Sequence, residues 1–506
     1  MSRRYSKNVA LNFDVLAAIM GLISSRMDLL AFMKTCKTLY REAIPYFLGL
    51  PIVIVYDEYD EGPPTPKHRL FCQYMLFNES RFIHIKDFTF HSSDESRDIP
   101  PLLRRLFQLI FQRSTKLERF CFYCLESFGM YPPALPTHSS FENLQRLNIM
   151  SLGPDGAAMI RGMHAPLKML TLSFDPDADI DKNPLVYLEN FSSTLESFEI
   201  SFGRFLDEPT SLRCDSLRRM RVFDCDIPDS SVIVQAFPKL SEFSFFDGSM
   251  DPEPNRGIRI ENVERLDELE RKWQALGSVH GEINSLYEFG LSCEVRRMDL
   301  HSCAVGRINS CRELLVKTRP SKLAIGMDNP QAIFAAERDI FGYGGLTELH
   351  VSLVFTREFV PSASPHELFE NLINSLKHAT SLSHLRITIS SGMQMCHICQ
   401  HKNLGLHTCA QAEESNELMA SSHHYPPSPV GEWLLKLDTQ DFVQRLIKAV
   451  STLESFVLDM GMGIPPSIHG WKISRDASPQ LVEVLTKKQC MELVEKVREC
   501  DCHYYY

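Results

Sequence analysis

The chain contains no run of about 18 apolar residues, so the sequence predicts no membrane-spanning helix. Basic residues are not in surplus either: 53 lysines and arginines stand against 64 aspartates and glutamates, for a net charge of −11. A general nucleic-acid binder is usually basic. The 15 cysteines have no framework spacing, which favours free thiols in a reducing compartment, the cytoplasm or the nucleus. The sequence therefore predicts that neither nucleic acid nor a membrane is the partner.

The common motifs of catalysis are missing as well. The segment Gly342-Tyr343-Gly344-Gly345 precedes a strand pattern rather than a helix, which is the wrong context for a phosphate-binding loop. There is no Gly-x-Ser-x-Gly elbow for a nucleophilic serine. The sequence therefore predicts a protein that is not an enzyme and has no cofactor, with an enzyme of unrecognised site as an open alternative.

A motif of the form Leu-x-x-Leu-x-Leu, with conservative exchanges, recurs along most of the chain. Copies begin at Leu117, Leu144, Leu167, Leu195, Leu217, Leu240, Val295, Leu346, Leu382 and Leu453, and degenerate copies begin at Ile85 and Pro320. Most starts lie about 22 to 32 residues apart, close to the leucine-rich-repeat period of about 20–29. Alternation along a strand places the fourth and sixth motif residues in the core and the third, fifth and seventh outside. The pattern predicts an α/β solenoid with a parallel sheet on its concave face and helices and turns outside, which binds a partner.

The spacing of the motif also predicts where helices and insertions lie. Helices are expected over 101–112, 261–276 and 366–378. The gap from Leu240 to Val295 is about two periods, which predicts a hidden repeat or a helical insertion at about 247–290. The longer gap from Leu382 to Leu453 predicts a second insertion at about 391–432.

Residues 11–50 differ from the repeats because their apolar residues recur at helical spacing. A first helix carries Val15, Leu16, Ile19, Met20 and Ile23, and a second carries Leu29, Leu30, Phe32 and Met33. Asp14 and Asp28 are expected to cap these two helices, and Pro45 is expected to end a third, since proline cannot donate to the helix ladder. Three short helices bury too little surface to be stable alone. The segment therefore needs a partner: the following domain, another protein, or both.

This N-terminal segment resembles an F-box. The resemblance rests on Leu11-Asn12-Phe13-Asp14-Val15-Leu16, Ile19, Met27-Asp28-Leu29-Leu30 and Thr35-Cys36-Lys37-Thr38-Leu39-Tyr40. With the tail 44–48 and the strand pattern 52–55, the chain is similar to the F-box proteins with leucine-rich repeats of mushroom-forming (basidiomycete) fungi. Asn12 stands where the family usually has proline.

The resemblance implies both a domain order and a function. The order is an F-box domain over 8–50, a linker and first strand region over 51–84, a leucine-rich-repeat solenoid over 85–470, and a C-terminal helical cap and tail over 471–506. The implied function is the substrate-recognition subunit of a Skp/cullin/F-box ubiquitin ligase, which docks on a Skp-type adaptor and holds a protein substrate on its repeats. The implied adaptor-binding residues are Leu11, Asn12, Val15, Leu16, Ile19, Leu29, Leu30 and Leu39. The alternative is a leucine-rich-repeat scaffold without a ligase role, in which residues 11–50 cap the solenoid.

Several outward motif positions in the middle and late repeats carry arginine, histidine or phenylalanine. The predicted substrate-binding residues are Arg219, Arg221, Phe223, Arg297, His301, His350 and Arg386. Arginine and aromatic side chains often dominate the energy of an interface, and arginine grips a carboxylate or phosphate with two parallel bonds. One hypothesis is therefore an acidic or phosphorylated ligand near the four arginines. The other is that these are ordinary solvated strand positions, neutralised by nearby carboxylates such as Asp299 and Glu348.

The second insertion contains cysteines and histidines at close spacing. Cys396 and Cys399 form a Cys-x-x-Cys pair, and His407 and Cys409 follow. Such a pair places two thiolates on one turn, as tetrahedral zinc requires. A structural zinc site formed by these four residues is one interpretation, and a polar loop without metal is the other.

Overall fold

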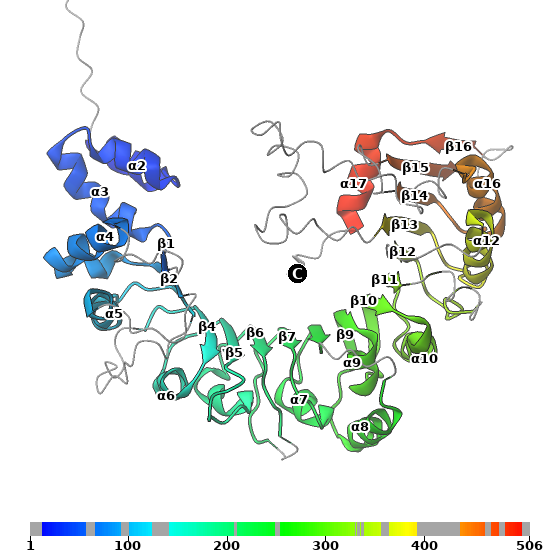
Figure 1. The fold of residues 1–506 in the computed structure, drawn as a ribbon, viewed down its shortest axis with the longest axis horizontal. Coiled ribbons are helices and arrows are strands. Elements are labelled where there is room, and N and C mark those ends of the chain that lie inside the picture. The colour runs from blue at the N-terminus through cyan, green and yellow to red at the C-terminus, as the bar shows by residue number, and fades with distance from the viewer. Residues whose placement is uncertain are drawn as a thin grey trace, which may run out of the picture. The chain divides into compact units, whose positions relative to one another are not determined.

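The computed structural model describes residues 13–56, 66–92, 101–123, 141–206, 210–247, 254–328, 330, 334, 339–355, 364–391, 436–460, 467–474 and 481–497. The chain divides into two compact units, Met1–Leu240 and Ser241–Tyr506. Each unit is a layer of β-strands with helices between successive strands (Figure 1).

The first unit begins with helices and continues as a parallel sheet. Its strands are β1 (Ile52–Tyr56), β2 (Asp87–Ser92), β3 (Arg119–Tyr123), β4 (Arg146–Leu152), β5 (Met169–Phe174), β6 (Ser197–Ser201) and β7 (Arg219–Phe223), and each is parallel to the next in the chain. Its helices are α1 (Phe13–Leu22), α2 (Arg26–Met33), α3 (Lys37–Gly49), α4 (Pro66–Phe77), α5 (Pro101–Arg113), α6 (Pro154–Gly162) and α7 (Ser230–Ala236). Short 3₁₀ helices are η1 (Glu79–His84), η3 (Pro184–Tyr187) and η4 (Glu189–Phe191).

Alternation along each strand separates the core from the opposite face. Phe120 and Phe122, the fourth and sixth motif residues of β3, are buried. Arg119, the third motif residue, occupies an outward position and is exposed. The ring of Phe107 from α5 packs edge-on against Phe88 and Phe90 of β2 at 5.5 and 5.0 Å. The core therefore lies between the strands and the helices. The outward motif positions form the opposite surface, called the polar face below.

Backbone hydrogen bonds at the strand entries repeat from one repeat to the next. The N–H groups of Glu118 and Arg119 both donate to Lys86 O, and those of Gln145 and Arg146 both donate to Glu118 O. Such bonds fix each motif copy one strand spacing from its predecessor and hold the copies in register. The register places equivalent motif positions directly opposite one another, for example Arg119 opposite Arg146.

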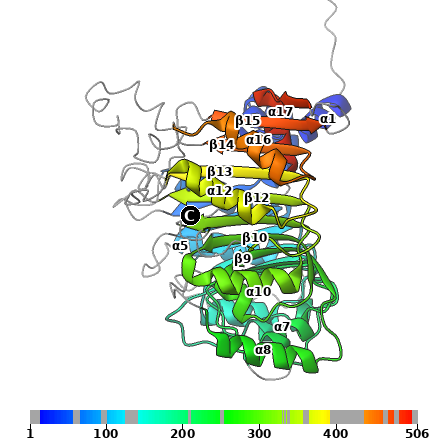
Figure 2. The ribbon, with the colours of Figure 1, turned by 90° about the vertical axis from the view of Figure 1, so that its right-hand side faces the viewer.

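The second unit continues the same strand-and-helix alternation and ends differently. Its parallel strands are β8 (Glu242–Phe246), β9 (Ala275–Glu282), β10 (Glu294–Cys303), β11 (Lys322–Asp328), β12 (Glu348–Phe355), β13 (His384–Ser391) and β14 (Ser455–Met460). Two antiparallel strands follow, β15 (Ser467–Ser474) and β16 (Leu481–Val484). The helices are α8 (Arg256–Glu268), α9 (Ile283–Glu288), α10 (Ile308–Thr318), α12 (Pro365–Leu376), α16 (Thr439–Ala449) and α17 (Lys487–Val497), with the 3₁₀ helix η5 (Val305–Arg307). Figure 2 shows the successive strands of this unit edge to edge.

These two units confirm the predicted α/β class and the parallel order of the strands that the motif copies form. The helices expected over 101–112 and 366–378 are α5 and α12. The helix expected over 261–276 is confirmed only in part, because α8 begins earlier, at Arg256, and ends at Glu268, and β9 begins at Ala275. The gap in which a hidden repeat or a helical insertion is expected thus contains a helix, α8, and a further strand, β9, between β8 and β10.

The sequence of β9 explains why its pattern is hard to recognise. It contains Gly277, Ser278 and Gly281 instead of alternating apolar residues. Gly281 has a φ of +154°, and a Cβ there would lie 2.1 Å from the carbonyl oxygen of Phe245 on β8. The close approach of the two backbones requires glycine at this position.

The ends of the N-terminal helices also differ from the prediction. Pro45 does not end the third helix; it lies inside α3, which continues to Gly49. The cap of α2 is Ser25, whose side-chain oxygen accepts a hydrogen bond from the N–H of Asp28 at 3.3 Å. Asp14 lies within the first turn of α1, so its carboxylate acts there on the helix dipole. At the other end, the segment expected to be a helical cap from 471 onward begins with strand residues of β15 and β16 before α17.

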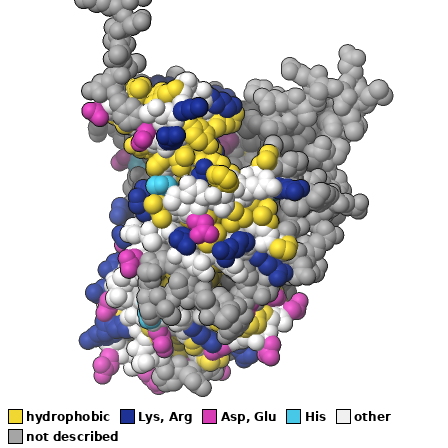
Figure 3. All heavy atoms as spheres, turned by 90° about the vertical axis from the view of Figure 1, so that its left-hand side faces the viewer, with side chains coloured by type: hydrophobic (Ala, Val, Ile, Leu, Met, Phe, Trp, Pro, Cys, Tyr) yellow, Lys and Arg dark blue, Asp and Glu magenta, His cyan; other side chains and the backbone are white. Residues whose placement is uncertain are grey.

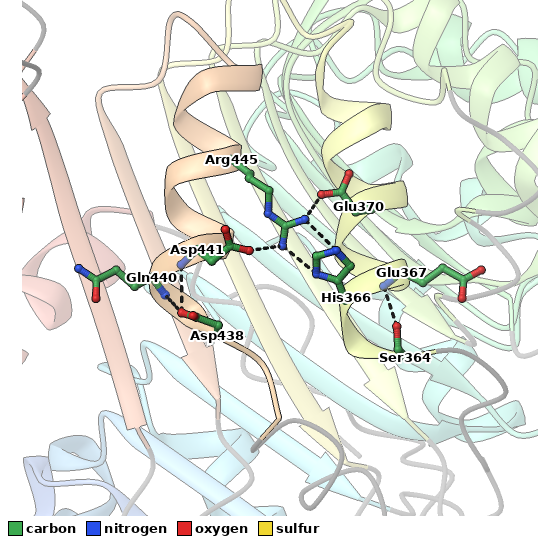
Figure 4. A network of polar contacts seen from close by, with 8 residues as sticks. All are labelled: Ser364, His366, Glu367, Glu370, Asp438, Gln440, Asp441 and Arg445. Atoms are coloured by element: carbon green, nitrogen blue, oxygen red, sulfur yellow. Dashed lines mark hydrogen bonds and ion pairs between the residues drawn. The ribbon is translucent and has the colours of Figure 1, made fainter.

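The helices α12 and α16 pack as neighbours although the long insertion separates them in the chain. The guanidinium of Arg445 on α16 lies 2.8 Å from the carboxylate of Asp441 and also contacts Glu370 of α12 (Figure 4). Both ring nitrogens of His366 lie within 3.2 Å of the same guanidinium. Ser364 and Asp438 cap the two helices with their side-chain oxygens. This network joins successive repeats on either side of residues 392–435, which lie outside the described residues.

Within the described ranges, no helix combines the length and the apolar character needed to cross a membrane.

Candidate functional site

The three N-terminal helices enclose a small core of their own. Its buried members are Met20, Leu29, Met33, Leu39 and Ala43, with Leu16 packed against them. Leu29 and Leu39, both predicted to bind the adaptor, therefore pack in the core of the three helices. Leu16 and Leu30 are half-buried, and Leu11 and Asn12 lie outside the described residues.

Apolar side chains remain exposed on the other side of this helical module. Val15, Ile19 and Leu22 follow one another on α1 at a spacing of four and three residues, and Met27 follows at the start of α2. Their exposed fractions are 45, 37, 84 and 74%. These four residues are called the apolar stripe below, and in Figure 3 hydrophobic side chains gather in the upper part of the view, where these helices lie. An exposed apolar patch of this kind marks a surface that binds a partner.

Two of the predicted adaptor-binding residues, Val15 and Ile19, thus lie on the stripe. Leu22 and Met27 were not predicted from the sequence. Leu22 continues the helical spacing of Val15 and Ile19, so the same periodicity was the signal that points to it. Met27 lies on α2, after the turn that follows α1, so periodicity within one helix does not point to it.

The helical module is attached to the sheet through its other side. The Nη2 group of Arg26 donates to the carbonyl oxygens of Leu50 and Pro51 at 3.0 Å each. Its guanidinium also lies 5.0 Å from the ring centre of Phe47, a cation–π contact. Burial lowers the pKa of Arg26. Because α3 packs against η1 as well, the module has one side fixed to the repeats and one side exposed.

The polar face of the second unit contains a hollow of about 400 Å³. Ala324 of β11, a small side chain, lies between Asp299 and His350 of the neighbouring strands, which leaves room at this point. Leu493 of α17 faces the hollow, and Figure 1 shows α17 on the side of the strands opposite to α12 and α16. The polar residues that line the hollow are Arg297, Asp299, Lys322, Glu348, His350, His384, Arg386 and Ser455, and Leu323, Leu349, Leu385 and Val457 complete the lining.

Three cations of this face each have a carboxylate partner among the described residues. Arg297 bonds Asp299 on its own strand at 3.2 Å, Lys322 lies 2.9 Å from Glu348, and a third pair joins Arg386 to Asp459 at 3.1 Å. His350 Nε2 lies 2.9 Å from the hydroxyl of Thr388. Two of the arginines predicted to bind an acidic ligand are therefore neutralised within the fold.

Asp299 is the centre of a second charge cluster of this face. His280 Nδ1 of β9 lies 2.9 Å from Asp299 Oδ2, and Arg297 Nη2 lies 3.2 Å from the same oxygen. Burial alone raises the pKa of Asp299, but the hydrogen bonds and charges of His280 and Arg297 outweigh burial, so the pKa is lowered. His280 was not predicted from the sequence, because β9 was not recognised as a strand. Burial lowers the pKa of the neighbouring His301, whose ring lies 5.3 Å from that of Phe246.

The other predicted substrate-binding residues lie on β7 of the first unit. Arg219 is exposed, Arg221 lies 3.7 Å from Glu199 of β6, and Phe223 is half-buried at the end of the strand. Of the seven predicted residues, three therefore lie on β7 of the first unit and four lie in the second unit.

The predicted zinc ligands Cys396, Cys399, His407 and Cys409 lie outside the described residues. Among the residues that are described, no group of three or more histidine, cysteine, aspartate or glutamate side chains is placed to hold a metal ion. No model of a known protein family matches the chain, and the comparison with curated proteins finds no match.

Proposed function

We propose that the chain is the substrate-recognition subunit of a Skp/cullin/F-box ubiquitin ligase, with an F-box in its N-terminal helices and a leucine-rich-repeat solenoid after it. The observation that carries the proposal is the apolar stripe. Val15, Ile19, Leu22 and Met27 are exposed on a module whose core is already filled and whose other side is fixed to the sheet. Together with the resemblance of residues 11–50 to an F-box, the stripe fits an adaptor-binding surface.

The role of such a chain is to bring a substrate close to a transfer machinery. The polar faces of the strands hold the substrate, while the helical module holds the adaptor. Attachment to one complex raises the effective concentration of substrate near the enzyme that transfers ubiquitin. The chain itself then needs no catalytic group.

The second candidate function is a leucine-rich-repeat scaffold in which the helical module is a cap. The contacts of Arg26 with Leu50 and Pro51, and the packing of α3 on η1, favour this reading, because a cap is fixed to the first repeat. A cap, however, gives no reason for four exposed apolar side chains on α1 and α2.

Capture of the Skp-type adaptor by the full chain tests the proposal. In the variant Ile19→Asp/Leu22→Asp two exposed stripe residues become charged while the core stays intact, and we expect loss of capture. The matched control is Leu70→Asp/Phe77→Asp, which charges two residues of α4 that are 64 and 88% exposed, and capture should persist. Circular dichroism of each variant verifies folding. The scaffold function is supported instead if the intact chain captures no adaptor. Capture by the stripe variant that equals capture by the intact chain would show that the adaptor binds another surface, which overturns the role of the stripe.

A further inference from the structure

The polar face of the first unit has an unbalanced row of arginines. The third motif positions lie opposite one another from strand to strand, in the order Asp87, Arg119, Arg146, Met169, Ser197 and Arg219. Arg119 forms an ion pair with Asp87. Arg146 lies on the far side of Arg119 from this carboxylate, so two arginines are direct neighbours. Like charges directly opposite one another destabilise a sheet.

In the described part of the chain, neither Arg146 nor Arg219 forms an ion pair, and both are exposed. Arg146 shares the field of Asp87 with Arg119, which is the arginine paired with that carboxylate. At the outward positions of β2 to β7, four arginines face only two carboxylates, Asp87 and Glu199. The second unit differs in this respect, since Arg297, Lys322 and Arg386 of its polar face each have a partner. A positive surface therefore remains on a chain whose net charge is −11.

The seventh motif positions of the same strands are uncharged. The ring of His91 on β2 stacks on that of Tyr123 on β3 at 3.7 Å, and Met150 of β4 lies opposite Tyr123. These positions are four residues along the strand from the arginine row, a distance of about 13 Å. The face thus offers positive charge at one end of the strands and aromatic and thioether surface at the other.

We propose that the polar face of β3 to β7 binds an acidic peptide segment of a protein partner, with its carboxylates on Arg146 and Arg219. Charge complementarity is the reason: a peptide carboxylate between Arg119 and Arg146 relieves their repulsion, and a second one pairs with Arg219. An apolar residue of the same segment contacts Tyr123 and Met150. The site does not depend on the helical module; that the peptide belongs to a ligase substrate rests on the proposed function.

The probe is a fluorescein-labelled peptide of eight glutamates with one central phenylalanine, measured by fluorescence anisotropy with the full chain. We expect binding that weakens as salt rises from about 50 to about 300 mM. In the variant Arg146→Glu/Arg219→Glu, the two proposed contacts with glutamates of the peptide become repulsive. This change should weaken peptide binding by about tenfold. The matched control, Arg69→Glu/Lys116→Glu, makes the same charge change at exposed positions on α4 and after α5, and its affinity should equal that of the intact chain.

The proposal is overturned if the intact chain does not bind the acidic peptide, or if the control loses as much affinity as the test variant. It is also overturned if a single-stranded DNA octamer binds this face more tightly than the peptide, because the face then recognises phosphate along a nucleic acid. Adaptor capture by Arg146→Glu/Arg219→Glu is measured in parallel. Peptide loss with adaptor capture retained supports both proposals, whereas peptide binding without any adaptor capture supports the peptide site alone.

Discussion

Arg386 on β13 donates from Nη2 to the Oδ2 atom of Asp459 on β14 at 3.1 Å, and the two side chains are only 10 and 15% exposed. The pair joins two neighbouring strands that the long insertion separates by 73 residues in the chain. The guanidinium of Arg386 is therefore engaged in an ion pair within the protein, although its residue type and outward position suggest a ligand contact.

The Arg386–Asp459 pair predicts a stability loss on substitution. Asp459→Ala leaves the buried guanidinium without this carboxylate, and we expect the free energy of unfolding to fall by about 1–3 kcal/mol. Urea denaturation measures it, and Arg386→Leu in the same background should restore part of the loss. As a control, Glu492→Ala removes the exposed pair between Lys488 and Glu492 and should change little. Equal stability of Asp459→Ala and the intact chain would show that the pair does not stabilise the fold.

Asp299 predicts a separate effect at acid pH. Its pKa is lowered from the ordinary value of 3.8, chiefly because His280 and Arg297 outweigh burial. A carboxylate with a lower pKa in the folded state contributes stability above its unfolded pKa and loses it as pH falls through the folded value. The intact chain should therefore lose stability below pH 3.8 more steeply than Asp299→Asn.

The histidine beside this carboxylate provides the control for that pH dependence. Burial lowers the pKa of His301 from 6.5, so its contribution is lost as pH falls below 6.5. In His301→Gln, the free energy of unfolding should fall less as the pH decreases below 6.5. Its slope below pH 3.8 should equal that of the intact chain. Unfolding free energies from pH 7 to pH 3 measure both windows, and an Asp299→Asn profile parallel to that of the intact chain below pH 3.8 contradicts the assignment.

The motif was sufficient to predict the strands because two residues in each copy must enter the core. Phe120 and Phe122 show the pattern, and the same alternation predicts which residues face outward. The pattern fails at β9 because Gly281 is required there by a close backbone approach, which no period of apolar residues signals. The periodicity of apolar side chains shows which residues are buried. The feature that marks β9 is instead the close approach of its backbone to that of β8 at Gly281.

The candidate sites could be predicted only in part, for a different reason. Arg219 and Arg386 both occupy outward motif positions, so the motif alone does not distinguish them. The residues that lie next to them belong to neighbouring strands. Asp459 pairs with Arg386, whereas Arg219 faces Ser197. Whether an arginine is available to a ligand is decided by its cross-strand neighbours, which depend on the register of the whole sheet.

Gly470 of β15 predicts how α17 is held on the strands. A Cβ at this position would lie 2.6 Å from the Sγ atom of Cys490, whose side chain is fully buried. Gly470→Ala should therefore push α17 away and expose the thiol, which we expect to react several times faster with a thiol reagent. Gly344→Ala is the control, because a Cβ there meets no atom within 4 Å. Reaction of Cys490 at the same rate in all three proteins, followed by mass spectrometry of its peptide, would contradict this packing.

Arg26 predicts how firmly the helical module is fixed to the first repeat. Arg26→Ala removes both hydrogen bonds to the carbonyl oxygens of Leu50 and Pro51 and the contact with the ring of Phe47. We expect a loss of about 1–3 kcal/mol in the stability of the module. Hydrogen exchange measures the loss locally: amides of α1 to α3 should exchange faster, while those of β3 and β4 keep their rates.

Two further variants separate charge from geometry in this contact. Arg26→Lys keeps the positive charge, but an ammonium lacks the planar fork of a guanidinium, so exchange should be intermediate. Arg69→Ala removes an exposed arginine of α4 and should leave every rate unchanged. If Arg26→Ala exchanges like Arg69→Ala, the module is held by the packing of α3 on η1. If exchange rises equally in the helices and in β3 and β4, the module and the repeats unfold as one unit, and Arg26 stabilises the unit as a whole.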